Sequence, residues 1–256
     1  MTPDKRKVFA ANWKMHQSPP EAVAFLRAFL GSFASASDRR VLIFPPAVSL
    51  HAVVEETRKR PDVEAGVQNI YWEAKGAFTG EISAELARDA GARHVLIGHS
   101  ERRHVFGETD AETGLKVKAA LRAGLTPMIC VGETLEEREA GETLSVVRRQ
   151  LRAAVEGVES LLGAVTGPMI AYEPVWAIGT GKTATPQDAA EVHTALRAEL
   201  IELCGGAASA ADIPILYGGS VKRDNVAALM AASEVGGVLV GGASLEAQHW
   251  MQIVSA

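Results

Sequence analysis

Eight short runs of apolar residues recur along the chain, and each is followed by a segment with helical features. They are rich in Val, Ile and Leu and show little alternation with polar residues, which is typical of strands buried on both faces of a parallel sheet. The runs span residues 8–11, 41–44, 63–67, 94–97, 127–131, 169–172, 213–217 and 238–240.

The segments after these runs carry signals for the start of helices. Ser18 precedes Pro19 and lies three residues before Glu21, which predicts an N-cap with a capping box. The same spacing of a hydroxyl residue and a glutamate begins at Thr109 and at Thr134. We expect helices over residues 50–59, 83–89, 186–203 and 245–253, and helices that open near residues 18, 109, 134 and 222.

The alternation of strands and helices predicts right-handed βαβ units and a parallel sheet. Eight such units favour a closed (β/α)8 barrel over an open sheet. No Gly/Ser-rich linker or change in composition divides the chain. We therefore expect an α/β protein in which residues 1–256 form a single barrel domain, with eight parallel strands ringed by helices.

Composition and charge narrow the class of protein further. Hydrophobic residues make up 47% of the chain, which suffices for a large core. The net charge of −5 predicts no nucleic acid or membrane partner, and residues 1–7 lack the hydrophobic region of a signal peptide. Cys130 and Cys204 form no Cys-x-x-Cys pair. We expect buried free thiols and a cytoplasmic location, with a Cys130–Cys204 disulfide as the alternative.

The segment after the sixth apolar run has the features of a catalytic base beneath a lid. Glu173 directly follows the strand at 169–172, and Pro174 ends that strand because it has no N–H to donate. The loop that follows is apolar at first and has glycines at its far end, including Gly179. Such a loop could close over a carboxylate on a rigid strand. The alternative is an ordinary acidic residue before an ordinary loop.

In a (β/α)8 barrel, the residues that follow the strands gather at one end. Asn12 and Lys14 follow the first strand and His99 follows the fourth, so a donor, a cation and a possible electrophile join Glu173. Lys14 could instead be a surface lysine, and His99 could satisfy a hydrogen bond in the core. Their joint placement at one end favours a catalytic site.

Glycine pairs after the seventh and eighth strands predict a phosphate group on the substrate. Backbone N–H groups at Gly241 and Gly242 can approach an oxyanion closely. Ser220 and Gly179 could supply further donors, although plain turns would also explain the glycines. The seven histidines form no ligand pattern, so we expect no metal site.

Eight segments together form a pattern that is specific for one family. They read NWKM at 12–15, QN at 68–69, GAFTGE at 76–81, GHSERR at 98–103, CVGE at 130–133, YEPVWAIGTGKT at 172–183, YGGSVK at 217–222 and VGGASL at 240–245. In these segments and in their order, the chain resembles the triosephosphate isomerase family over essentially its whole length. Departures are small: His16 stands where asparagine is common, and Ala11 stands where glycine is common.

The resemblance implies interconversion of dihydroxyacetone phosphate and D-glyceraldehyde 3-phosphate through an enediolate, in glycolysis and gluconeogenesis. It implies that Glu173 removes the proton next to the carbonyl group and that neutral His99 donates a hydrogen bond to the carbonyl oxygen. Lys14 would supply fixed positive charge, with Asn12 as a further donor. Glu101 is expected to pair with Lys14, or else to handle protons itself. This chemistry needs no redox cofactor or metal.

The resemblance also implies a homodimer. The loop at 68–81 is too long for an ordinary βα connection and resembles the family segment that inserts into the partner subunit near its active site. Thr79 would then approach Asn12 and Lys14 across the interface, and Glu81 could pair with Arg102. A flexible surface loop is the alternative.

Two other functions stay open on the residues alone. A Schiff-base aldolase is one, because Lys14 follows a barrel strand and the phosphate site suits the same triose. The other is a catalytically inactive barrel that acts as a binding or scaffold protein, although all the catalytic positions hold the expected residue types.

Overall fold

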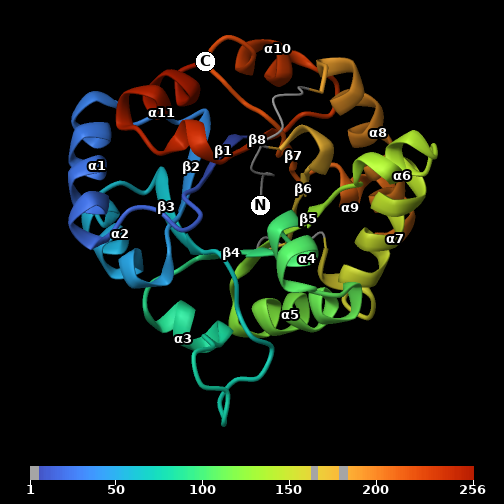
Figure 1. Ribbon diagram of the computed structural model, residues 1–256, viewed down its shortest axis with the longest axis horizontal. Helices are drawn as coiled ribbons and strands as arrows, with labels where there is room; N and C mark the ends of the chain where they lie inside the picture. Colours follow the sequence, from blue (N-terminus) through green and yellow to red (C-terminus); the bar gives the residue numbers. More distant parts are fainter. Residues whose placement is uncertain (1–5, 163–166, 179–183) are drawn as a thin grey trace.

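The chain folds into a closed parallel barrel surrounded by helices (Figure 1). This computed structural model describes residues 6–162, 167–178 and 184–256. Neighbouring strands follow the chain order, and β8 closes the barrel by pairing with β1. Within the described residues the strands are β1 (Lys7–Asn12), β2 (Arg39–Phe44), β3 (Val63–Val67), β4 (His94–Ile97), β5 (Thr126–Val131), β6 (Met169–Tyr172), β7 (Ile215–Tyr217) and β8 (Gly237–Val240). The predicted fold class is confirmed.

Alternate residues along each strand face opposite sides, which explains the two separate cores. Leu42, Leu96 and Leu216 belong to the cluster that fills the barrel interior. Val41 and Ile43 belong to the larger cluster between the strands and the helices. Because both faces are buried, the strands read as continuous apolar runs in the sequence.

The helices that ring the barrel begin largely where the sequence predicts. Ser18 N–H donates to the Glu21 carboxylate at 2.8 Å, so the predicted capping box opens the first helix. The helices are α1 (Pro19–Ser32), α2 (Leu50–Thr57), α3 (Ala84–Asp89), α4 (Ser100–Phe106), α5 (Asp110–Ala123), α6 (Leu135–Glu139), α7 (Thr143–Val155), α8 (Pro186–Leu203), α9 (Ala207–Ala210), α10 (Val226–Ala231) and α11 (Ala247–Val254). Short 3-10 turns are η1 (Ala47–Ser49), η2 (Glu159–Leu161), η3 (Val175–Ala177) and η4 (Gly242–Ser244).

Several predicted boundaries are wrong. Helix α4 was not predicted, because its N-cap is His99 and its charged sequence lacks apolar periodicity. The helix expected from Thr134 is two helices, α6 and α7, since Gly141 between them adopts a φ of +75°. The helix expected near Lys222 begins later, because Lys222 N–H first donates to Asn225 Oδ1 in a turn. Strand β7 and helix α11 each begin two residues later than expected.

A polar cluster occupies the N-terminal end of the barrel, opposite the strand ends that carry the predicted site. Glu64 on β3 accepts a hydrogen bond from Arg40 Nε at 3.0 Å and lies 3.2 Å from His94 Nε2. Burial alone would raise the pKa of Glu64, but the hydrogen bond from His94 and the charge of Arg40 lower it to about 2. Ionised groups therefore lie partly buried at this end as well.

The two cysteines are both free. Cys130 on β5 is buried, as expected, whereas Cys204 at the end of α8 is partly exposed, so the prediction of two buried thiols is wrong for Cys204. None of the helices in the described part of the chain has the length and apolar character of a membrane span.

Candidate active site

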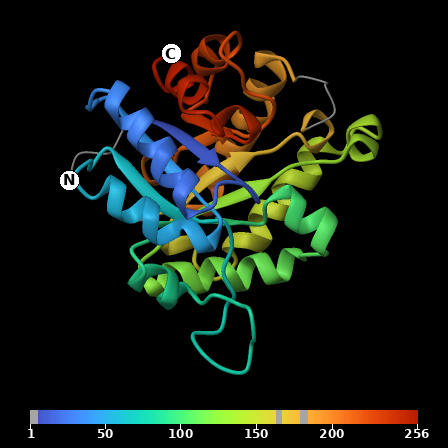
Figure 2. The same ribbon diagram turned by 60° about the vertical axis from the view of Figure 1, so that its left-hand side comes forward.

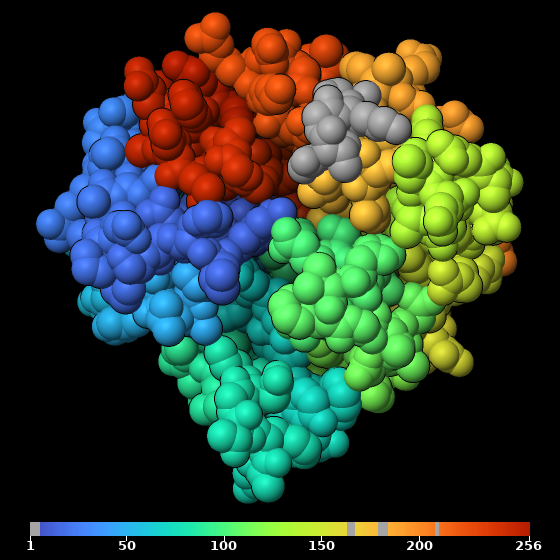
Figure 3. All heavy atoms as spheres, viewed as in Figure 1, coloured from blue at the N-terminus to red at the C-terminus, as the bar shows by residue number. Residues whose placement is uncertain are grey.

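The C-terminal ends of the strands bring the predicted catalytic residues into one cavity of about 280 Å³. Its lining includes Asn12, Lys14, His99, Glu173, Ser220, Gly241 and Gly242. On this face the segment that contains Lys14 lies beside α4 (Figure 3). Gly179 lies outside the described residues. Glu101 and Thr79 do not line the cavity, and Thr79 is exposed on the loop that follows β3.

Glu173 is held in place by its backbone and by both carboxylate oxygens. Its N–H donates to the carbonyl of Val131 at 2.8 Å, which extends the β5–β6 pairing by one residue. Oε1 lies 2.9 Å from His99 Nε2, and Oε2 accepts a hydrogen bond from Ser100 N–H at 2.9 Å. Burial raises the pKa of Glu173, but contact with His99 and the Ser100 hydrogen bond outweigh it and lower the pKa. Glu173 is therefore an ionised carboxylate near neutral pH.

His99 has its ring oriented by the helix that it caps. Glu101 N–H donates to Nδ1 at 3.2 Å, so the proton of the neutral ring resides on Nε2, facing Glu173. Burial is the largest single influence and lowers the pKa of His99, but the charge of Glu173, its hydrogen bond with the ring and the charge of Glu101 together outweigh burial and raise the pKa. A second proton on Nδ1 would break the hydrogen bond from Glu101. The ring of His99 is thus a hydrogen-bond donor at Nε2. Its pKa, and therefore its charge, depends on the position of the Glu173 carboxylate.

Lys14 adopts a left-handed backbone conformation, with a φ of +52°, which side-chain-bearing residues seldom adopt. Its N–H donates to Asn12 Oδ1 at 3.0 Å and its carbonyl accepts from Gln68 Nε2 at 2.8 Å. The ammonium donates to Glu101 at 2.6 Å. The side chain passes Gly241 so closely that a Cβ there would lie 3.2 Å from Lys14 Cε. Lys14 is therefore a fixed cation at the cavity wall.

The loops after β7 and β8 form another part of the cavity wall, and the loop after β8 adjoins Lys14. Gly242 borders open space, since a Cβ built on it meets no atom within 4 Å. Asn225 Nδ2 donates to the Ser220 carbonyl at 2.9 Å and fixes the loop after β7. A small anionic group can therefore approach this backbone without meeting side chains.

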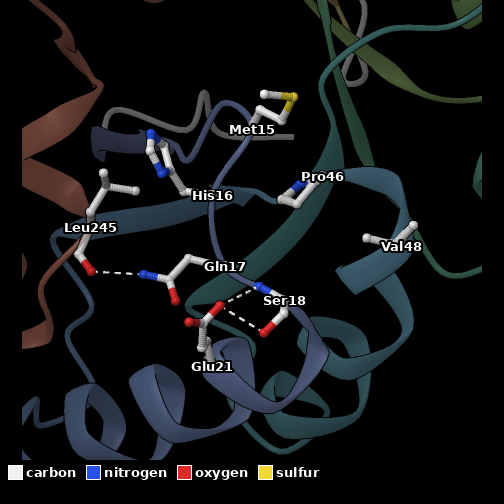
Figure 4. Close-up of a pocket in the computed structure, with 8 residues that line it drawn as sticks. All are labelled: Met15, His16, Gln17, Ser18, Glu21, Pro46, Val48 and Leu245. Carbon is white, nitrogen blue, oxygen red and sulfur yellow. Dashed lines mark hydrogen bonds between the residues drawn. The ribbon is translucent and has the colours of Figure 1, made fainter.

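A larger cavity, of about 510 Å³, has a different set of lining residues, which Figure 4 shows. Its lining begins at Met15, directly after Lys14, and includes Gln17, Val48 and Leu245. Gln17 Nε2 donates to the Leu245 carbonyl at 2.8 Å. Because it contains none of the predicted catalytic residues, its size does not make it the reaction centre.

Nearly the whole sequence is similar to proteins of one known family. The model of the family described as "Triosephosphate isomerase" matches residues 7–256. The chain belongs to the triosephosphate isomerase family. Relatives named triosephosphate isomerase include proteins from Moorella thermoacetica and Endomicrobium trichonymphae, 48% and 47% identical over 98% of both chains, and from Roseiflexus sp., 48% identical over 96% of both chains. The predicted family and the predicted isomerase class are confirmed.

Two residues that support the candidate active site of this member of the triosephosphate isomerase family had no signal of their own in the sequence. Gln68 Nε2 donates a hydrogen bond to the carbonyl of Lys14, and Ser100 N–H donates one to the Glu173 carboxylate. Both occur in the segments shared with the family, QN and GHSERR, but spacing and residue type alone did not assign them a contact.

Proposed function

We propose that the chain interconverts dihydroxyacetone phosphate and D-glyceraldehyde 3-phosphate, with Glu173 as the base. The observation that carries the proposal is the buried contact of 2.9 Å between Glu173 Oε1 and His99 Nε2 at the end of the barrel. It places a carboxylate beside a hydrogen-bond donor at the cavity, so that the carboxylate can serve one substrate carbon while the donor serves the oxygen on the neighbouring carbon.

Each group has one role in this proposal. Glu173 takes a proton from the carbon next to the carbonyl group, and His99 Nε2–H donates to the carbonyl oxygen as it becomes negative. Lys14 and Asn12 stabilise the same charge. The hydroxyl group on the deprotonated carbon gives its proton to the former carbonyl oxygen. Glu173 returns the proton that it took to the former carbonyl carbon, so atoms and charge balance.

The phosphate group is assigned to the wall formed by Ser220, Gly241 and Gly242. The open space at Gly242 and the nearby ammonium of Lys14 support this assignment. Gly179, outside the described residues, is proposed as a further donor.

A coupled assay with D-glyceraldehyde 3-phosphate tests the base. Glu173→Asp keeps the charge but withdraws it by one methylene, so we expect kcat to fall about 100-fold or more with the fold intact. Glu136→Asp, which shortens an exposed carboxylate on α6, is the matched control and should keep the wild-type kcat. Equal activity of Glu173→Asp and wild type would exclude Glu173 as the base.

The alternative of a Schiff-base aldolase is less well supported. The Lys14 ammonium donates to Glu101 at 2.6 Å, an arrangement that suits a fixed cation better than a nucleophilic amine. Family membership likewise favours an active isomerase over an inactive scaffold.

A homodimer is proposed through the loop at residues 68–81. This loop projects from the barrel in two views (Figures 1 and 2), and it exposes Phe78. The cavity beside Lys14 presents Met15, which is 93% exposed, and Val48. The loop of a second copy could cover these apolar groups and bring Thr79 toward the site. Glu81 remains proposed to pair with Arg102, although Arg102 Nε already donates to Glu108 at 2.6 Å within the chain.

Sedimentation tests the dimer. Phe78→Asp should convert a dimer to a monomer and reduce activity, because a charge would have to be buried in the cavity. Leu161→Asp alters a similarly exposed apolar residue on η2 and should sediment as the wild type does. A fully active wild-type monomer would contradict the proposal.

A cytoplasmic location and a single domain over residues 1–256 complete the proposal. The two free cysteines agree with a reducing compartment.

A further inference from the structure

Beyond the end of β4, strand β5 has no strand neighbour on one side. The two strands pair as far as Ile97 and Ile129. Gly98 then adopts a φ of +72° and the chain turns into α4. Backbone groups of β5 beyond Ile129 that face this side need other hydrogen-bond partners, because they are buried.

A side-chain amide takes the place of the missing strand. Gly132 N–H donates to Gln150 Oε1 at 2.7 Å, and Gln150 Nε2 donates to the Gly132 carbonyl at 3.1 Å. Gln150 lies on the buried face of α7 and is 5% exposed. Its amide therefore does for Gly132 what a peptide group of a neighbouring strand would do.

The other side of the same segment holds Glu173. The carbonyls on either side of Gly132, those of Val131 and Glu133, accept hydrogen bonds from Glu173 N–H at 2.8 Å and Val175 N–H at 3.1 Å. Gly132 also packs so tightly that a Cβ built on it would lie 1.7 Å from the carbonyl oxygen of Glu173. Any shift of Gly132 is therefore passed on to the backbone of Glu173.

We propose that Gln150 is a positioning residue for Glu173. Its amide fixes Gly132, Gly132 fixes the backbone of Glu173, and the carboxylate thereby keeps its place against His99. The proposal rests on the role of Glu173 as the base. Gln150 does not line the cavity, so it acts on proton transfer and leaves the binding of substrate unchanged.

The test compares kcat and KM of Gln150→Leu and Gln150→Glu with the wild type in the full-length protein. Leucine keeps the approximate size and removes both hydrogen bonds, so we expect kcat to fall roughly 10- to 100-fold with KM little changed. Glutamate keeps the acceptor for Gly132 N–H but loses the donor, so its kcat should lie between those of Gln150→Leu and the wild type. If Gln150→Leu does not fold, Gln150→Glu carries the comparison.

Val147→Ala provides the control for a purely structural effect. Val147 is buried on the same face of α7, and its apolar side chain cannot bond to Gly132. The variant should unfold at a lower temperature and keep the wild-type kcat at 25 °C. An unchanged kcat in folded Gln150→Leu or Gln150→Glu, or an equal loss of kcat in Val147→Ala, would overturn the proposal.

A double-mutant cycle separates this proposal from the assignment of the base. If Gln150 acts through Glu173, then Gln150→Leu should lower kcat by a much smaller factor in a Glu173→Asp background than in the wild type. Full additivity would overturn the role of Gln150 and leave Glu173 as the base. Wild-type kcat in Glu173→Asp alone would instead overturn the assignment of Glu173.

Discussion

The contact between Glu173 and His99 fixes the protonation of both side chains. It lowers the pKa of Glu173 and raises that of His99, although burial acts in the opposite direction on each. Family resemblance implied a neutral His99. The hydrogen bond from Glu101 N–H to Nδ1 supports that form once the carboxylate no longer faces Nε2. A displacement of Glu173 away from His99 would therefore also lower the pKa of the imidazole that we propose as the electrophile.

We predict that Glu173→Gln lowers the pKa of His99, because burial remains while the opposing negative charge is removed. Titration of the imidazole nitrogens by NMR would measure the shift. Glu101→Gln, which removes a more distant and more exposed carboxylate, should lower the pKa less. An unchanged pKa in Glu173→Gln would mean that another group controls His99.

The positions of single residues at strand ends were predictable, because the barrel topology brings the C-terminal ends of all its strands to one end of the molecule. Asn12, His99 and Glu173 all line the cavity as that argument requires. The bonds that hold them were not predictable. Nothing in the residues around Gln68 or Gln150 indicates that each amide reaches a backbone group far away in the sequence, since such contacts depend on how strands and helices pack.

At the scale of elements, local signals located helices that begin with a side-chain cap. Helices α1 and α5 begin at the predicted capping boxes, α8 covers the predicted residues, and β1 and β2 were predicted to within two residues at each end. Helix α4 lacked such a signal, because histidine is an uncommon N-cap and its first turn depends on packing against the site. The sequence therefore predicted the strands and the capped helices of the barrel, but it did not predict α4, the helix that orients His99.

We predict that Thr109→Ala destabilises the protein by about 1 kcal/mol, because α5 loses the hydroxyl that accepts from Glu112 N–H at 3.2 Å. Chemical denaturation would measure the change in free energy of unfolding. Thr109→Ser keeps the hydroxyl and should retain most of the stability. Equal losses in the two variants would point to the methyl group rather than the cap.

At the scale of the whole molecule, the barrel has ionised groups at both ends and an apolar interior between them. The end opposite the site holds Arg40, Glu64 and His94, with the charge of Arg93 nearby. Burial lowers the pKa of His94 further than contact with Glu64 raises it. Both Glu64 and His94 therefore bind protons less readily in the folded state than in the unfolded state, so unfolding takes up protons.

We predict that this end of the barrel makes the protein less stable in acid. The stabilisation from Glu64 is fully present above about pH 4.5 and is lost as the pH falls toward its folded pKa of about 2. Free energies of unfolding measured between pH 3 and 5 should depend less on pH in Glu64→Gln than in the wild type. Glu136→Gln, at an exposed position on α6, should leave the slope as it is. An unchanged slope in Glu64→Gln would exclude the cluster as its source.

The loop that projects after β3 is already ordered by its own side chains. The ring of Tyr71 lies 4.1 Å from that of Trp72 and 4.6 Å from that of Phe78, and Tyr71 also pairs with Ser83 at the base of the loop. A segment with its shape set beforehand loses little conformational entropy when it enters a cavity. If the protein forms the dimer that we propose, a synthetic peptide of residues 70–83, cyclised where Tyr71 and Ser83 meet, should inhibit it by blocking assembly instead of competing with the substrate.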